Sequence, residues 1–128
     1  MSGEIAAVVA YPSKHPETGE PLQFDMNYYL SGHMPLIDRA WGPYGLKSWS
    51  INQFQNPCPL TGETPPYLVQ TTCCFDSVEN LKTALEKGSA ETRLDVAKFS
   101  NVFPVIWIGE IAKRETLDGR ESAGVAWA

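Results

Sequence analysis

One amphipathic segment, residues 24–46, constrains the fold of this chain more than any other stretch. Mostly apolar residues recur in it at spacings of three and four: Met26, Leu30, His33, Ile37 and Trp41. This is the period of one helix face, so the pattern predicts a helix that ends where Gly42 and Pro43 follow. His33 shares the apolar face and therefore points inward, where a titratable ring needs a partner or a function.

Both the start of this helix and an interruption within it can be predicted. Asp25 is suited to cap the N-terminus, because its carboxylate can accept hydrogen bonds from backbone N–H groups two or three residues later. Pro35 has no backbone donor for the carbonyl of Ser31 and disfavours helical geometry in the preceding residue. We therefore expect the helix to kink or break near residues 32–35 and to resume with Pro35 in a first-turn position. His33 would then lie near a new helix N-terminus, whose partial positive charge favours the neutral imidazole. A neutral imidazole can accept a proton, which makes His33 a candidate general base.

The rest of the chain alternates between strand-like and helix-like stretches. β-Branched and aromatic residues indicate four strands: residues 5–11, 46–55, 67–75 and 103–111. Asp76 and Glu79 begin a second helix in the manner of a capping box, and Gly88 is expected to end it. Residues 89–99 form a shorter helix in this interpretation, and their charges of alternating sign are typical of a solvated face.

The order strand, helix, strand, strand, helix, strand is the ferredoxin-like βαββαβ pattern, an α+β fold with a four-stranded antiparallel sheet. Helices cover one face of such a sheet, and a second copy of the chain covers the other face symmetrically. We therefore expect a homodimer, built from a domain at residues 1–113. Residues 114–128 are expected to form a C-terminal tail that is either disordered or docked on the partner subunit. Docking is considered because Val125 and Trp127 at its end are apolar.

A motif in the first helix points to a family. The run F-D-x-x-Y-Y-x-x-x-H-M-P-L at residues 24–36 resembles the hallmark of the EthD family, small proteins of the dimeric α+β-barrel superfamily. Further matches lie at residues 11–12, 45–46 and 95–99, so that the resemblance covers residues 5–111. It implies a homodimeric barrel in which two sheets face each other.

Composition argues against several kinds of partner. The chain has 128 residues, a net charge of −5 and no cluster of basic residues, which argues against binding to nucleic acid or to an anionic membrane. No apolar run approaches the ~20 residues of a membrane span, and no signal peptide is recognisable. The three cysteines lack metal-site spacing, and free thiols are typical of a reducing compartment. We therefore expect a cytoplasmic protein without a metal site.

Three functional interpretations are open. The first is an enzyme that transfers a proton through His33, without a metal or an organic cofactor, and with Tyr29 or Tyr28 as hydroxyl donor. Asp25 and Tyr11 would bind the substrate. Flat apolar side chains would hold an aromatic ring: Trp41, Trp49, Phe54 and Trp107. The family resemblance implies breakdown of small organic compounds or tailoring of aromatic polyketides, by lyase, decarboxylase, dehydratase or isomerase chemistry.

The second interpretation is a non-catalytic accessory protein that binds a small molecule in the same pocket, because the type member of the family is associated with an oxidative degradation system. The third is structural: His33 is a core residue hydrogen-bonded to the carbonyl that Pro35 leaves free. Haem binding is not expected, because the placement of Cys and Met residues gives it no support. Loss of turnover in His33→Gln with retained binding would favour the enzyme over the other two interpretations.

Overall fold

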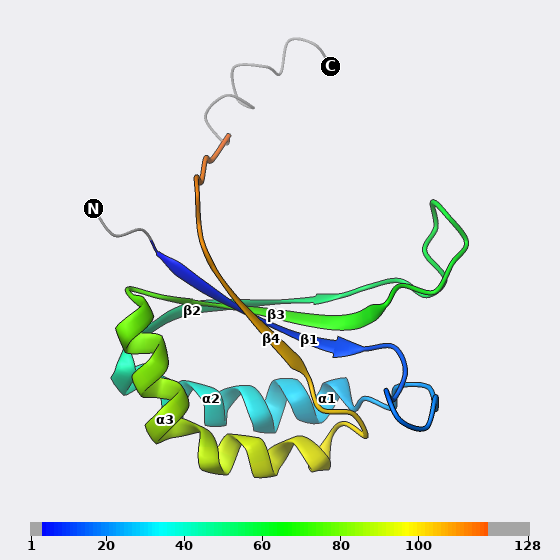
Figure 1. Cartoon of the computed structure of the whole chain (residues 1–128), viewed down its shortest axis with the longest axis horizontal. Helices are drawn as coiled ribbons and strands as arrows, with labels where there is room; N and C mark the ends of the chain where they lie inside the picture. The colour runs from blue at the N-terminus through cyan, green and yellow to red at the C-terminus, as the bar shows by residue number, and fades with distance from the viewer. Residues whose placement is uncertain (1–3, 118–128) are drawn as a thin grey trace.

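The four strands form one antiparallel sheet in the order β2-β3-β1-β4. The computed structural model describes residues 4–117. The strands are β1 (Ile5–Pro12), β2 (Leu46–Gln53), β3 (Tyr67–Phe75) and β4 (Val105–Glu110). β1 pairs with both β3 and β4 and is central, whereas β2 and β4 are the edges (Figure 1). The predicted α+β fold with a four-stranded antiparallel sheet is confirmed.

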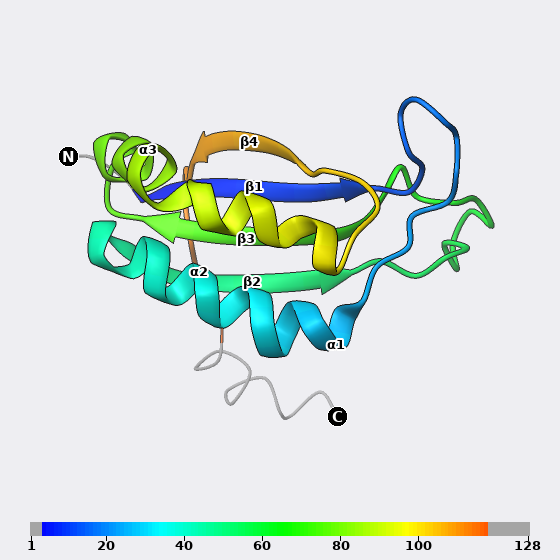
Figure 2. The ribbon, with the colours of Figure 1, turned by 90° about the horizontal axis from the view of Figure 1, so that it is seen from below.

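All helices lie on one face of this sheet (Figure 1). The first helical run comprises α1 (Met26–Tyr28), the π-helical turn η1 (Tyr29–His33), α2 (Met34–Trp41) and the 3-10 turn η2 (Gly42–Tyr44). The second comprises α3 (Val78–Asp95) and the 3-10 turn η3 (Val96–Lys98). The two runs lie side by side beneath the strands (Figure 2). None of the helices in residues 4–117 has the length and apolar character needed to cross a membrane.

The predicted resumption of the helix with Pro35 in its first turn is confirmed, since α2 begins at Met34. The chain is not broken at residues 32–35, however. The chain instead widens into a π-helical turn, in which the N–H of Met34 donates to the carbonyl of Tyr29. A π turn inserts one extra residue, and here it ends two residues before Pro35, which cannot donate. The extra residue also shifts the buried face, so that Tyr29 is buried while Leu30, predicted to point inward, is 48% exposed.

The prediction that Gly88 ends the second helix is also wrong. A single helix runs from Val78 to Asp95, and Ser77 rather than Asp76 caps it by accepting from the N–H of Asn80 at 3.1 Å. A Cβ on Gly88 would lie 2.6 Å from the carbonyl oxygen of Ala40. The glycine therefore allows α3 to approach α2 closely.

The hydrophobic core fills the space between the sheet and the helices. Alternate residues of β1 and β3 face it, among them Val9, Tyr11 and Val69. The other face of the sheet carries no helix, and residues 111–117 leave the sheet on that side (Figure 1). Arg114 there makes an ion pair with Glu4 at 2.6 Å. The predicted tail contacts at Val125 and Trp127 lie outside the described residues.

Candidate active site

A cavity of about 230 Å³ lies between the sheet and the two helical runs. Its lining includes Tyr29, His33 and Trp41 from the first helical run, Tyr11 and Thr71 from the sheet, and Arg93 from α3. The lining of the cavity thus brings together side chains that are far apart in the sequence. One general-base candidate, His33, is part of its wall.

His33 is paired with a buried carboxylate. Its Nδ1 lies 3.0 Å from Oδ2 of Asp95, the last residue of α3, and both side chains are buried. The hydroxyl of Tyr28 donates to Oδ1 of the same carboxylate at 2.8 Å. Lys98, one turn after Asp95, places its Nζ 3.5 Å from Oδ1. The carboxylate therefore has three partners and one of them is the imidazole.

The environment of this pair favours a neutral imidazole beside an ionised carboxylate. Burial lowers the pKa of His33, and the hydrogen bond and charge of Asp95 oppose this shift without reversing it. Burial raises the pKa of Asp95, but its hydrogen bonds from His33 and Tyr28 outweigh that effect and leave it below the ordinary value. An ionised carboxylate can only accept, so Nδ1 carries the proton and Nε2 keeps its lone pair. Nε2 has no hydrogen-bond partner among residues 4–117.

The predicted cause of the neutral imidazole was only partly right. We expected burial and a new helix N-terminus at His33 to act together. Burial acts, but the helix continues through η1 into α2 and leaves no free N-terminus at that point. The downward direction of the pKa shift therefore rests on desolvation.

Two aromatic rings fix the plane of the imidazole. Tyr29 stacks on His33 with ring centroids 5.3 Å apart and an interplanar angle of 14°. Phe99 contacts the ring with centroids 4.5 Å apart at 55°. These two contacts, together with the bond to Asp95, restrain the orientation of the ring. A base restrained in this way needs little reorganisation before it accepts a proton.

The hydroxyl of Tyr29 lies 2.6 Å from Oγ1 of Thr71, and either atom could be the donor. Burial is the main cause that raises the pKa of Tyr29 to about 12 and raises that of Tyr11 as well. Both phenols therefore stay protonated and can act as neutral donors. Tyr28 does not line the cavity, and its hydroxyl is engaged by Asp95, so Tyr29 is the better placed of the two predicted hydroxyl donors.

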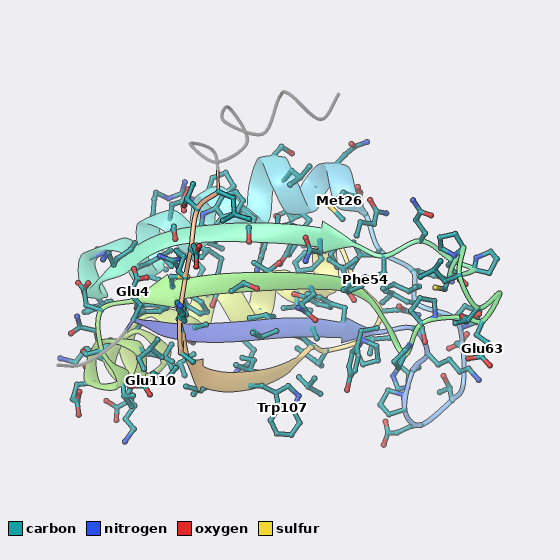
Figure 3. All side chains as sticks on the ribbon, turned by 90° about the horizontal axis from the view of Figure 1, so that it is seen from above. Glu4, Met26, Phe54, Glu63, Trp107 and Glu110 are labelled. Atoms are coloured by element: carbon teal, nitrogen blue, oxygen red, sulfur yellow. The ribbon has the colours of Figure 1, made fainter. Side chains whose placement is uncertain are left out.

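Tyr11 and Trp41 also line this cavity, whereas the remaining predicted site residues do not. Asp25 is an exposed helix cap that accepts from the N–H of Tyr28 at 3.0 Å. The indole of Trp49 donates to Asp38 at 2.7 Å, outside the cavity lining. Phe54 follows β2 in a loop, and Trp107 lies on β4 away from the helices (Figure 3). Of the four predicted aromatic walls, Trp41 alone lines the cavity.

Sequence reasoning missed Asp95. Residues 89–99 were interpreted as a solvated face, yet Ser89, Thr92, Asp95 and Phe99 are buried. Their spacing of three and four residues marks one helix face, and this signal could have identified Asp95 as an inward-pointing carboxylate. Within residues 4–117, no three His, Cys, Asp or Glu side chains gather in a way that could hold a metal ion.

No protein-family model matches the sequence, and no curated protein is significantly similar to it. Solved structures are similar. An EthD-like protein from Ralstonia eutropha JMP134 is 25% identical, with a TM-score of 0.75 and coverage of 91% of this chain and 98% of that chain. An EthD family protein from Bacillus halodurans C-125 is 21% identical, with a TM-score of 0.58 and coverage of 84% and 97%.

A dimeric ferredoxin-like protein of unknown function from Thermobifida fusca YX has the same fold at 9% identity, with a TM-score of 0.52 and coverage of 87% of this chain and 93% of that chain. The three likenesses extend over most of the chain and agree on its architecture. The likeness to the EthD-like protein from Ralstonia eutropha confirms the resemblance that the sequence motif indicated, and all three confirm the ferredoxin-like fold.

Proposed function

Because this chain resembles EthD-like proteins in fold and in its central motif, and because His33 is paired with Asp95 at a cavity, we propose that it is an enzyme that transfers a proton on a small aromatic or polyketide-like substrate. The chemistry is of the lyase, decarboxylase, dehydratase or isomerase type and needs no metal or organic cofactor. The observation that carries the proposal is the buried His33–Asp95 pair at the cavity wall.

The pair supports a simple mechanism. Nε2 of His33 removes a proton from an activated C–H or O–H bond, and the electron pair of that bond moves into the substrate as an enolate or phenolate. Asp95 accepts the Nδ1–H bond throughout and stabilises the imidazolium that forms. The imidazolium then returns the proton to another carbon or to a leaving hydroxyl. A positioned base of this kind contributes on the order of 10²–10⁴-fold.

Tyr29 is the side chain suited to stabilise the developing oxyanion. Its ring stacks on His33, and burial raises the pKa of its hydroxyl to about 12, which keeps it protonated. A protonated phenol in a site that excludes water can donate to an enolate oxygen more strongly than it would in water. Thr71, 2.6 Å from the Tyr29 hydroxyl, would then orient that donor.

The size and lining of the cavity favour a substrate of one or two rings. Its volume of about 230 Å³ exceeds the ~150 Å³ of an engineered cavity that binds benzene, and it lies below the ~300–1,000 Å³ of drug-sized sites. Tyr11, Tyr29, Trp41 and Phe103 contribute flat surfaces to the lining. A bicyclic aromatic compound matches this space better than a larger polycycle.

The assembly that we propose is a homodimer through the helix-free face of the sheet. Trp107 is 68% exposed, and its partner in the register is Val8, next to the core residue Val9 on the opposite face. A second copy would cover this indole and the small side chains beside it. Light scattering at micromolar concentration should give twice the chain mass, and Trp107→Ser should weaken the dimer. A stable monomer would contradict the assembly.

The proposed function can be tested without knowing the natural substrate. A panel of one- and two-ring phenolic ketones is incubated with the protein in D₂O, and exchange of activated C–H positions is followed by NMR. We expect His33→Gln to lower catalysed exchange by about 10²-fold or more, because glutamine cannot accept the proton. His15→Gln is the matched control, since His15 lies in a loop and does not line the cavity.

The outcomes separate the interpretations. Exchange that depends on His33 supports the enzyme. Equal exchange rates for His33→Gln and the wild type would show that the histidine is structural. Binding of panel members without exchange by the wild type would assign the chain to the accessory-binder alternative.

A further inference from the structure

The permanently charged side chain in the cavity lining is positive, although the chain as a whole has a negative net charge. The sequence contains 15 acidic and 10 basic residues, and its net charge is −5. Among the described residues, Arg93 is the one lining side chain with a permanent charge, and no carboxylate lines the cavity. Arg93 forms no ion pair within residues 4–117. Its exposed position places this cation where the cavity opens to solvent.

Two further polar groups in the lining lack a partner. The hydroxyl of Ser89 and the indole Nε1 of Trp41 are buried, and neither has a hydrogen-bond partner in the described part of the chain. Ser89 precedes Arg93 by four residues, so the two side chains share one face of α3. Trp41 packs on α3 in the turn that contains Ser89, because its Cδ1 lies 2.9 Å from where a Cβ on Gly88 would be.

Ser89 and Trp41 lie at the opposite end of the cavity from the His33–Asp95 pair, and Arg93 lies between Ser89 and Asp95 along α3. Helical side chains lean toward the N-terminus of their helix, so the Arg93 side chain extends toward Ser89. Six residues of α3 separate Ser89 from Asp95, which is about 9 Å along the helix axis at the rise of an α-helix. Eight residues separate His33 from Trp41 along the first helical run, or about 12 Å. The His33–Asp95 pair and the donors of Ser89 and Trp41 therefore lie about one to two aromatic rings apart.

We propose that the substrate is an aromatic acid whose carboxylate binds beside Ser89 and Trp41, where the side chain of Arg93 reaches it, while its reacting carbon lies beside His33. Arginine and indole N–H groups can only donate, and a carboxylate can only accept, so their hydrogen-bonding capacities match. The serine hydroxyl reaches such a ligand by rotation about its Cα–Cβ bond. This inference rests on the proposed function and specifies its substrate class.

The arrangement also distinguishes among the proposed reactions. A carboxylate held beside Ser89 and Trp41 serves recognition, because Ser89 lies about 9 Å along α3 from Asp95, the partner of the base. The bond that changes is then at the other end of the molecule. Dehydration or isomerisation therefore fits this arrangement, whereas loss of the bound carboxylate does not.

Matched acid and amide probes test the carboxylate site by binding alone. Calorimetry compares benzoate with benzamide and 2-naphthoate with 2-naphthamide, which differ in charge and hardly in shape. We expect the better-binding acid to bind at least ten-fold more tightly than its amide. Arg93→Gln and Ser89→Ala should each weaken binding of that acid by about ten-fold or more and change binding of the amide by less than three-fold, since hydrogen bonds to charged groups are the strong ones.

Arg39→Gln is the control for loss of a positive charge, because Arg39 is an exposed residue of α2 outside the cavity lining. It should leave the preference for the acid unchanged. The inference is wrong if neither acid binds more tightly than its amide, or if Arg93→Gln weakens acid and amide equally.

The two proposals fail in different measurements. If binding prefers acids in a way that depends on Arg93, but C–H exchange is unchanged in His33→Gln, the carboxylate site is supported and the proposed function is refuted. If C–H exchange requires His33, but acid and amide bind equally well, the proposed function is supported and the aromatic-acid substrate class is refuted.

Discussion

Gly88 lies within α3, and its replacement by alanine has two opposing effects on stability. Alanine has the higher helix propensity, but its Cβ would clash with α2. Alanine at this position favours the helix by about 1 kcal/mol over glycine, because it restricts the unfolded chain and adds no polar group. The added Cβ, however, would lie 2.6 Å from the carbonyl oxygen of Ala40 and 2.9 Å from Cδ1 of Trp41. Both distances are below ordinary van der Waals contact.

The packing effect should exceed the helix preference. The Ala40 carbonyl belongs to the backbone of α2 and cannot rotate away, so the two helices must separate. Overpacking of this kind costs typically about 1–3 kcal/mol. After the gain of about 1 kcal/mol in helix preference, we expect Gly88→Ala to lower the free energy of unfolding by up to about 2 kcal/mol.

Urea unfolding followed by far-UV circular dichroism, at one fixed protein concentration, measures this difference. Ala90→Gly is the matched control, because Ala90 is an exposed residue of the same helix. It should lower stability by about 1 kcal/mol through helix preference alone. If Gly88→Ala instead raised stability by that amount, the close approach of α2 and α3 at this point would be refuted.

Three further predictions concern the site and the core. Asp95→Asn should lower the pKa of His33 further, because the carboxylate opposes the downward shift, and NMR titration would detect the change. The stability of the wild-type protein should fall as pH drops below about 6.5, since the unfolded chain then binds a proton that the buried imidazole resists. Pro35→Ala supplies the missing N–H donor and should favour an ordinary α-helical turn over η1, so an unchanged His33 titration would contradict the link between that turn and the pair. Iodoacetamide should label the half-buried Cys58 well before the core residue Cys73, and equal labelling rates would contradict the burial of β3.

Local patterns in the sequence determined much of this fold. Spacings of three and four residues placed His33 on an inward helix face, and alternating or β-branched runs located the four strands to within about two residues at their ends. The cap at Asp25 was also identified, because capping depends on residues three positions apart. Each of these features is decided by contacts close in sequence.

The His33–Asp95 pair was decided by tertiary structure. Asp95 lies 62 positions from His33, and its charged neighbours made it resemble part of a solvated face. Only the alignment of α3 beside the first helical run brings the two side chains to 3.0 Å. Gly88 shows the same dependence, since glycine usually ends a helix and here serves a close helix contact.

The aromatic residues of the strands show what the alternating pattern of a strand cannot predict. A period of two separates the faces of β2 and β4, but it does not say how far the helices extend over either face. Trp49 and Trp107 were therefore assigned to a pocket that neither of them lines. The position of the helices over the sheet decides which aromatic residues meet a ligand, and that position follows from the packing of α2 and α3 rather than from any one segment of sequence.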